Sequence, residues 1–213
     1  WNRVSRQARV PAGDPMSRVD WNHRARTGEL TTIQFREERA ATVVLVIDAR
    51  MAAYRSPDPH DSHAVDRAVT AAGRLYSTLT DAGNRVGIAA VGSEPCWLAP
   101  GSGVDHGIEA REFLATHPAL SPVPAGEQPS PTRWEDRLRK RLAPGMQVFV
   151  LSPLCDDWGR DVARRVEEHG HRTTVVSIDP TIDREPGHRL SRVAREKRIS
   201  TLRSAGLPVI DWQ

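Results

Sequence analysis

An aspartate at the end of a predicted buried strand is the first residue of this sequence whose position favours chemistry. The run Ala41–Asp48 consists of apolar and β-branched residues and ends on the carboxylate of Asp48. Such a run is typical of a strand that is buried on both faces, in a sheet covered by helices on both sides. Folds of this class bind ligands outside the carboxyl ends of their strands, so Asp48 stands where a site would lie.

Three common catalytic or cofactor-binding patterns are missing from the sequence. A phosphate-binding loop needs several glycines after the first strand, and residues 49–54 contain none. A nucleophile elbow needs G-x-S-x-G, but Ser152, the nearest candidate, lacks both glycines, and we interpret it as a loop hydroxyl. The eight histidines show no paired spacing typical of zinc sites. We therefore expect neither a nucleotide site nor an enzyme.

Composition indicates a soluble globular chain with one sizeable core. The 213 residues suffice for such a core, and 16 prolines and 15 glycines imply several loops. Mean hydropathy is −0.50, and no apolar run approaches the ~20 residues of a membrane span. Cys96 and Cys155 lack a C-x-x-C spacing, so we expect reduced thiols and no metal at these positions.

The net charge of +3 is concentrated at the two ends of the chain. Residues 1–39 carry eight arginines against five acids, and residues 184–213 carry seven basic residues against three acids. Modules that bind nucleic acid usually interleave aromatic residues or glycines with their basic residues, and neither end does so. We expect solvated surface here and no nucleic-acid partner; binding of DNA by the basic ends remains an alternative.

Periodicity predicts strands that alternate with helices. The predicted strands cover 30–37, 41–48, 85–91, 96–98, 147–151, 173–178 and 208–210. The predicted helices cover 62–81, 104–116, 158–169, 190–205 and a segment capped by Thr132, and residues 117–131 are predicted to be a loop. This alternation is typical of an α/β fold with a mostly parallel, doubly wound sheet. We expect residues 1–29 to be an irregular, Arg-rich lead-in packed on one domain that covers 30–213.

Motifs at both ends of the chain resemble a known family. The start, with Asp14, the segment 18–21 and the segment 25–30, resembles the signature of the bacterial domain-of-unknown-function family fifty-eight. Residues 202–212 are similar to the end of that family. The strand that ends at Asp48, together with the long helix and the strand after it, resembles a von Willebrand factor A domain. The resemblance implies a von Willebrand A-like three-layer sandwich with helices on both faces of a mostly parallel sheet.

The resemblance also implies a setting. Members of the family typically follow N-terminal membrane helices, and they are often encoded beside a MoxR-type AAA+ ATPase. It therefore implies that this soluble domain works at the cytoplasmic side of a bacterial membrane, anchored by segments outside this chain, with such an ATPase as partner. The chain begins at Trp1, and we interpret it as a piece of a longer protein. Five residues of the N-terminal motif are expected to clamp the lead-in to the domain: Asp14, Arg18, Asp20, Trp21 and Arg26.

In the broader superfamily, a metal-ion-dependent adhesion site holds Mg²⁺ with Asp-x-Ser-x-Ser, a distant Thr and a distant Asp. Asp48 matches the first aspartate, but Arg50 and Ala52 occupy the two hydroxyl positions. Thr132 is a plausible match to the threonine, although a role as helix cap explains it equally well. The match to the first part of the adhesion site is therefore incomplete.

The last ligand of the adhesion site is also displaced. Pro153 stands where the second aspartate is expected, and Asp156 and Asp157 follow three residues later. Mg²⁺ demands a nearly ideal octahedron of oxygens, so we expect no metal here. A metal-dependent module with a site reassembled from Asp48, Thr132 and Asp156 or Asp157 is the alternative, and an uncharacterised hydrolase that uses this edge is another.

Arg50 leads to a more specific hypothesis. Its guanidinium is a permanent cation that pairs with carboxylates at two points and needs no metal. We expect Arg50 to replace the ion beside Asp48, either as a structural pair, which we favour, or as the receptor for a partner's acidic residue. The predicted edge for partner binding consists of Asp48, Arg50, Thr132, Asp156 and Asp157.

Overall fold

The computed structural model describes residues 6–9, 31–34, 40–50, 53, 63–91, 96–120, 131–179 and 188–212. The chain forms two units, Trp1–Arg39 and Ala40–Gln213, and each is described by itself. In the first unit, strand β1 (Arg6–Arg9) pairs antiparallel with strand β2 (Thr31–Gln34).

This pairing corrects two predictions about the start of the chain. Residues 6–9 form a strand within the segment predicted to be irregular. Residues 31–34 belong to the first unit, although the sequence placed the start of the α/β domain at residue 30. The alternating pattern around β2 identifies a strand but not the strand that it pairs with. The motif residues Asp14, Arg18, Asp20, Trp21 and Arg26 lie outside the described residues, so the clamp and the packing of the lead-in stay predictions.

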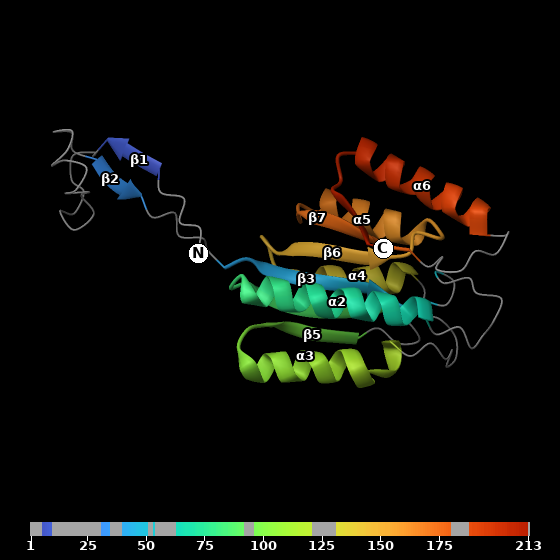
Figure 1. Cartoon of the computed structure of the whole chain (residues 1–213), viewed down its shortest axis with the longest axis horizontal. Helices are drawn as coiled ribbons and strands as arrows, with labels where there is room; N and C mark the ends of the chain where they lie inside the picture. Colours follow the sequence, from blue (N-terminus) through green and yellow to red (C-terminus); the bar gives the residue numbers. More distant parts are fainter. Residues whose placement is uncertain are drawn as a thin grey trace. The chain divides into compact units, whose positions relative to one another are not determined.

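The second unit is built on one six-stranded sheet with the order β5-β4-β3-β6-β7-β8. All neighbouring strands are parallel except β5, which runs antiparallel to β4. Strand β5 lies at one edge of the sheet (Figure 1). The strands are β3 (Thr42–Asp48), β4 (Arg85–Val91), β5 (Cys96–Gly101), β6 (Gln147–Ser152), β7 (Thr173–Ile178) and β8 (Val209–Trp212). The six strands predicted for this unit are confirmed to within a few residues at their ends.

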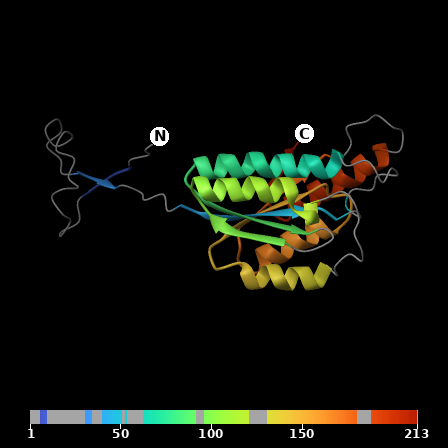
Figure 2. The same ribbon diagram turned by 90° about the horizontal axis from the view of Figure 1, so that it is seen from below.

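Helices cover both faces of the sheet, which makes three layers (Figure 2). Helices α2 and α3 pack on one face, whereas α4, α5 and α6 pack on the other. Their bounds are α2 (His63–Asp81), α3 (Val104–Thr116), α4 (Pro131–Arg141), α5 (Trp158–Glu168) and α6 (His188–Ser204), with a 3₁₀ turn η3 (Pro118–Leu120). The predicted helices are confirmed; η3 lies in the segment predicted to be a loop. No helix in these described ranges is long and apolar enough to cross a bilayer.

Strand β3 is the centre of the core because both of its faces are covered. Val43, Leu45 and Ile47 pack beneath α2, while Val44 and Val46 pack beneath α4 and α5, and all five are at most 1% exposed. A strand buried in this way needs apolar residues at every position, which explains the continuous run in the sequence.

The order of the strands also locates the site. The chain leaves β3 toward β4 on one side, and it leaves β6 toward β7 on the other. The connections therefore diverge above the carboxyl ends of β3 and β6, which is the place where open α/β sheets bind ligands. Asp48 and Ser152 are the last residues of these two strands.

Candidate functional site

Two buried side chains face each other at the carboxyl ends of β3 and β6. Asp48 and Ser152 are both completely buried. The Ser152 hydroxyl donates a hydrogen bond to Asp48 Oδ2 at 3.0 Å, and it accepts one from the Leu154 backbone N–H at 3.2 Å. The interpretation of Ser152 as a loop hydroxyl is therefore wrong, because this residue ends a core strand and holds the aspartate in place.

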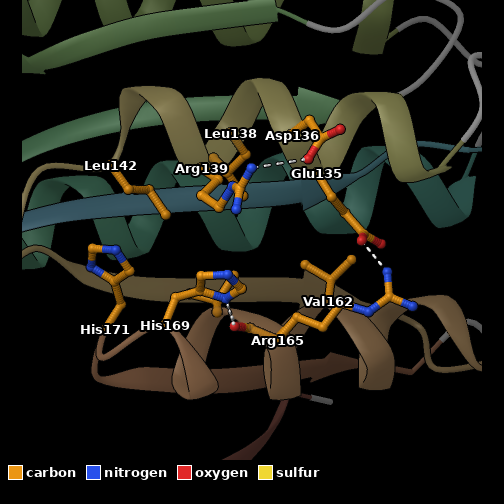
Figure 3. A pocket seen from close by; sticks show the side chains of 10 residues that line it. Glu135, Asp136, Leu138, Arg139, Leu142, Val162, Arg165, His169 and His171 are labelled. Atoms are coloured by element: carbon orange, nitrogen blue, oxygen red, sulfur yellow. Dashed lines mark hydrogen bonds and ion pairs between the residues drawn. The ribbon is translucent and has the colours of Figure 1, made fainter.

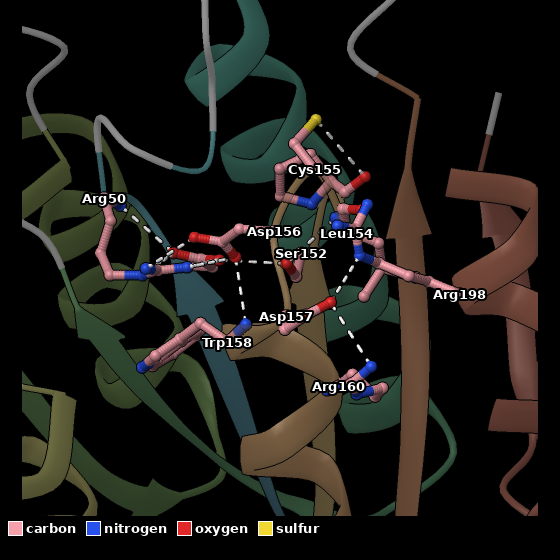
Figure 4. A network of polar contacts seen from close by, with 11 residues as sticks. Arg50, Ser152, Leu154, Cys155, Asp156, Asp157, Trp158, Arg160 and Arg198 are labelled. Atoms are coloured by element: carbon pink, nitrogen blue, oxygen red, sulfur yellow. Dashed lines mark hydrogen bonds and ion pairs between the residues drawn. The ribbon is translucent and has the colours of Figure 1, made fainter. Parts of the chain in front are cut away.

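Arg50 lies between two carboxylates (Figure 4). On one side its Nε and Nη2 donate to Asp48 Oδ1 and Oδ2 at 2.9 and 3.0 Å. On the other side its Nη1 and Nη2 donate to Asp156 Oδ2 and Oδ1, both at 3.0 Å. Arg50 is only 6% exposed. Two-point pairing of this kind is the strongest form of a side-chain ion pair, and it fixes the plane of the guanidinium.

Trp158 lies against one face of the Arg50 guanidinium, and Trp134 packs against Trp158. The Arg50 Cζ lies 4.2 Å from the ring centroid of Trp158, the first residue of α5. The Trp158 ring is 5.4 Å from that of Trp134 in α4, and the two planes are tilted by 55°. The Trp158 backbone N–H also donates to Asp156 Oδ1 at 3.1 Å. A cation over an indole face gains about 1–2 kcal/mol when it is desolvated, so Arg50 joins the sheet edge to the α4–α5 layer.

The loop from β6 to α5 is held along its whole length. Leu154 is fully buried with a positive φ of 55°, which costs an L-residue roughly 1–2 kcal/mol. Its carbonyl accepts a hydrogen bond from Arg198 Nη1 at 3.2 Å, and Arg198 Nε donates to Asp157 at 2.9 Å. Arg160 also lies 3.4 Å from Asp157. These contacts fix the loop that carries Asp156.

The electrostatics of the site follow from burial and from these pairs. Burial raises the pKa of Asp48 above its usual range, and the charge and hydrogen bonds of Arg50 oppose that shift. Burial lowers the pKa of Arg50, but the two carboxylates outweigh burial, so its pKa is raised overall and it stays cationic. The hydrogen bond from Arg198 lowers the pKa of Asp157. The site is thus a fixed ionic cluster and does not present an unpaired buried charge.

The described residues do not fit a divalent cation. Both oxygens of Asp48 already accept hydrogen bonds from Arg50, and the guanidinium fills the space between Asp48 and Asp156. Mg²⁺ requires about six oxygens in an octahedron. Among the ranges that the structure covers, no group of three or more His, Cys, Asp or Glu side chains is placed to hold a metal. In the described structure, the Arg50 guanidinium is the cation that both carboxylates hold.

The predicted edge is assembled only in part. Asp48, Arg50 and Asp156 come together, but Asp157 faces Arg198 and Arg160. The prediction that Thr132 caps a helix is wrong because α4 begins at Pro131, whose fixed φ suits the first helical position. The Thr132 side chain lies outside the described part of the chain.

Three residues that build the site were not predicted from the sequence as parts of it: Ser152, Trp158 and Arg198. Ser152 ends a buried strand just as Asp48 does, and this shared position was a signal that was available. Trp158 and Arg198 carried no such signal, because their contacts to the site depend on how α5 and α6 pack.

The strand order and the layers define the fold, and a match to a family model defines the family. A mostly parallel six-stranded sheet with one antiparallel edge and helices on both faces defines a von Willebrand factor A-like domain. The chain belongs to the family described as "Protein of unknown function DUF58", whose model matches residues 7–188.

Several solved structures are similar to this chain. BatB from Bacteroides thetaiotaomicron, a conserved hypothetical protein, is 14% identical, with a TM-score of 0.45 over 82% of this chain and 91% of that one. An aerotolerance-related membrane protein from Bacteroides fragilis is 15% identical, with a TM-score of 0.47 over 82% and 92%. Manganese-loaded TRAP protein from Plasmodium vivax is 16% identical, with a TM-score of 0.40 over 73% and 62%. Comparison with curated proteins gives no match.

Proposed function

We propose that this domain is a non-enzymatic protein-interaction and assembly module that works without a bound metal, its adhesion-site edge being degenerate. One observation carries the proposal: the Arg50 guanidinium pairs at two points with Asp48 and at two points with Asp156. The charge that Mg²⁺ supplies in a metal-dependent adhesion site is here part of the chain. A buried, paired carboxylate has neither the free base nor the open position that catalysis requires.

The contacts favour the structural role of Arg50 over a role as a receptor. Its N–H groups make four hydrogen bonds to the two carboxylates, one face of its guanidinium lies on Trp158, and only 6% of the residue is exposed. A partner's carboxylate that paired with it at two points would have to displace Asp48 or Asp156, and Asp156 also accepts a hydrogen bond from the α5 backbone. We therefore assign Arg50 to closing the edge and to holding α5.

The proposed partner is a MoxR-type AAA+ ATPase, and the proposed setting is the cytoplasmic side of a bacterial membrane. Both rest on what the resemblance to this family implies; the family match itself concerns residues 7–188 and a protein of unknown function. Anchoring is assigned to segments outside this chain.

The decisive experiment is a pull-down of a purified MoxR-type ATPase from the same organism, with Mg²⁺ and then with EDTA. We expect the ATPase to be retained equally in both, and the melting temperature of the domain alone to be the same with Mg²⁺, with Mn²⁺ and with EDTA. Loss of retention on chelation, or a higher melting temperature with either metal, would overturn metal independence. Absence of retention in both buffers would exclude this class of partner. The ATPase itself binds Mg²⁺ nucleotide, so a nucleotide-free sample is the matched control.

A further inference from the structure

The exposed apolar side chains of the second unit lie at the two edges of its sheet. Four large apolar side chains are exposed among the described residues: Val104, Ile108, Val193 and Ile210. The first two belong to α3, which packs beside the edge strand β5. The other two belong to α6 and to the edge strand β8, beside which α6 packs. Because β5 and β8 are the outermost strands of the sheet, the two pairs lie on opposite sides of this unit (Figure 1).

Helix α3 turns an apolar pair toward the solvent. Val104 and Ile108 are 78% and 54% exposed. They lie one turn apart on the same face, since residues four positions apart are neighbours on a helix. A surface helix ordinarily turns its large apolar side chains toward the core. This pair therefore marks the outer face of α3 as a surface for contact with another molecule.

The charges beside this pair are mostly negative. Helix α3 carries three acids and one arginine, all exposed: Asp105, Glu109, Glu112 and Arg111. Glu109 lies 3.6 Å from His106, and within the described ranges none of the three carboxylates forms an ion pair with arginine or lysine. We call Val104, Ile108 and the three acids the α3 surface. It offers unpaired negative charge around an apolar centre.

The opposite edge carries the opposite charge. Val193 is 63% exposed and Ile210 is 44% exposed. The described side chains of α6 include three exposed cations, Arg192, Lys197 and Arg203, against one exposed acid, Glu196. Lys197 lies one turn from Val193 on the outer face of the helix. We call Val193, Ile210 and the three cations the α6 surface.

The cations of the α6 surface are free to pair with a partner. None of the three forms an ion pair with a carboxylate in the part of the chain that the structure describes. Arg203 donates one hydrogen bond, from Nη2 to the Val209 carbonyl oxygen at 3.3 Å. The nearby carboxylate of Asp211 is already paired with Arg195. The α6 surface therefore keeps its excess of positive charge.

The groove between α4 and α5 lacks this contrast (Figure 3). Its acids are paired with its arginines, Glu135 with Arg165 and Asp136 with Arg139. A balanced lining whose charges are already paired selects no charge in a partner. The two edges of the sheet differ from it because their charges are unequal and unpaired.

We infer that the α3 surface of one copy of this chain docks on the α6 surface of the next copy. Three acids and one arginine beside an apolar pair meet three cations and one acid beside another apolar pair. One chain carries both surfaces, so a second copy is the partner whose charge and polarity match each of them. The two surfaces differ and lie on opposite sides of the unit, so the contact is heterologous and joins copies head to tail. The inference goes beyond the proposed function, because it concerns contacts between copies and not contacts with the ATPase.

The first test is sedimentation velocity of the whole chain over a range of protein concentrations. At low ionic strength we expect the weight-average sedimentation coefficient of wild type to rise with concentration. In about 1 M NaCl, where the Debye length is about 3 Å, association should weaken about tenfold. A wild type that stays monomeric at low ionic strength, or that associates equally at both salt concentrations, would overturn the inference.

Two charge reversals test the two surfaces separately. Glu109→Lys/Glu112→Lys makes the α3 surface basic, and Arg192→Glu/Lys197→Glu makes the α6 surface acidic. Each should weaken self-association at least about tenfold, because like charges then face each other. The matched control Arg137→Glu/Lys140→Glu makes the same charge change on exposed positions of α4 and should associate as wild type does. All three variants change exposed side chains, so their melting temperatures should stay close to that of wild type.

Mixing the two reversed variants tests the head-to-tail arrangement. The α3 variant keeps a basic α6 surface, and the α6 variant keeps an acidic α3 surface, so an equimolar mixture should associate although neither variant does so alone. Loss of association in only one variant, equal loss in the α4 control, or a mixture that stays monomeric would each overturn the inference. Association lost through only one surface would mean that this surface binds its own kind or an unrelated partner.

The apolar part of the contact has its own variant. Ile108→Gln keeps every charge and removes an exposed apolar side chain, so the fold should be unaffected while self-association weakens about tenfold. Unchanged self-association would show that the apolar pair is not in the contact and would overturn the inference.

Retention of the ATPase separates this inference from the proposed function. If wild type stays monomeric but retains the ATPase, the inference is wrong and the proposed function stands. If wild type and its variants associate as expected but wild type does not retain the ATPase, the inference stands and the proposed partner is wrong.

Discussion

Arg50 and Asp48 form a two-point ion pair inside the protein, with Nε–Oδ1 at 2.9 Å and Nη2–Oδ2 at 3.0 Å. The two residues are separated by a single position at the end of β3, so a short local segment supplies both charges. Transfer of both ions from water costs free energy, and only close pairing with further hydrogen bonds repays it. Ser152 and Asp156 provide those hydrogen bonds, and removal of one ion is therefore expected to be costly.

The first prediction concerns Arg50→Met, which keeps the apolar contact with Trp158 and removes the charge. Asp48 is then left buried and unpaired, so the free energy of unfolding should fall by roughly 3–5 kcal/mol. Urea unfolding at neutral pH measures this. The double variant Asp48→Asn/Arg50→Met removes both charges and should recover most of the loss. A single variant that loses less than about 1 kcal/mol would mean that the pair behaves like an exposed ion pair.

The second prediction concerns pH. Burial raises the pKa of Asp48, and Arg50 opposes the shift, so Arg50→Met should raise this pKa further. A carboxyl whose pKa is higher in the folded state than in the unfolded state stabilises the folded protein fully at pH values below the unfolded pKa. This stabilisation is lost as the pH rises through the folded pKa. The stability deficit of Arg50→Met relative to wild type should therefore grow as the pH rises above the ordinary range of a carboxyl pKa. Asp48→Asn/Arg50→Met lacks the titrating carboxyl, so its deficit should not grow over this range. Urea unfolding across this range checks the sign, and a deficit that shrinks with rising pH would contradict it.

The third prediction compares two helical glycines. A Cβ at Gly159 in α5 would lie 2.5 Å from Ser152 Oγ and 2.8 Å from Ser152 Cβ, whereas a Cβ at Gly73 in α2 would have its nearest contact at 3.8 Å, to Leu114. Gly159→Ala should lower the free energy of unfolding by roughly 1–3 kcal/mol because it crowds the residue that holds Asp48. Gly73→Ala should raise it by roughly 0.5–1 kcal/mol because alanine favours helix. Chemical denaturation of both variants measures the difference, and equal effects would show that Ser152 yields without cost.

Much of the fold follows from the sequence because its signals are local. The continuous apolar run at 41–48 and the amphipathic period of α2 identify their elements without knowledge of any partner. The alternation of strands and helices then requires a doubly wound sheet, and the position of Asp48 at the end of the first buried strand marks the edge of the site. The pairing of Arg50 with Asp48 was also predictable, since the two residues are neighbours on one short segment.

The remaining features were decided by the tertiary structure. Asp156 completes the pair only because β6 lies beside β3, and Trp158 supports the guanidinium only because α5 packs on that face. The pairing of β1 with β2 and the groove between α4 and α5 likewise depend on residues far apart in the chain. Periodicity reports which face of an element is apolar, but it does not report what that face meets. Contacts between elements are set by strand register and helix packing. The sequence alone therefore located the edge at the carboxyl end of β3, and only the assembled sheet showed that Arg50 closes this edge.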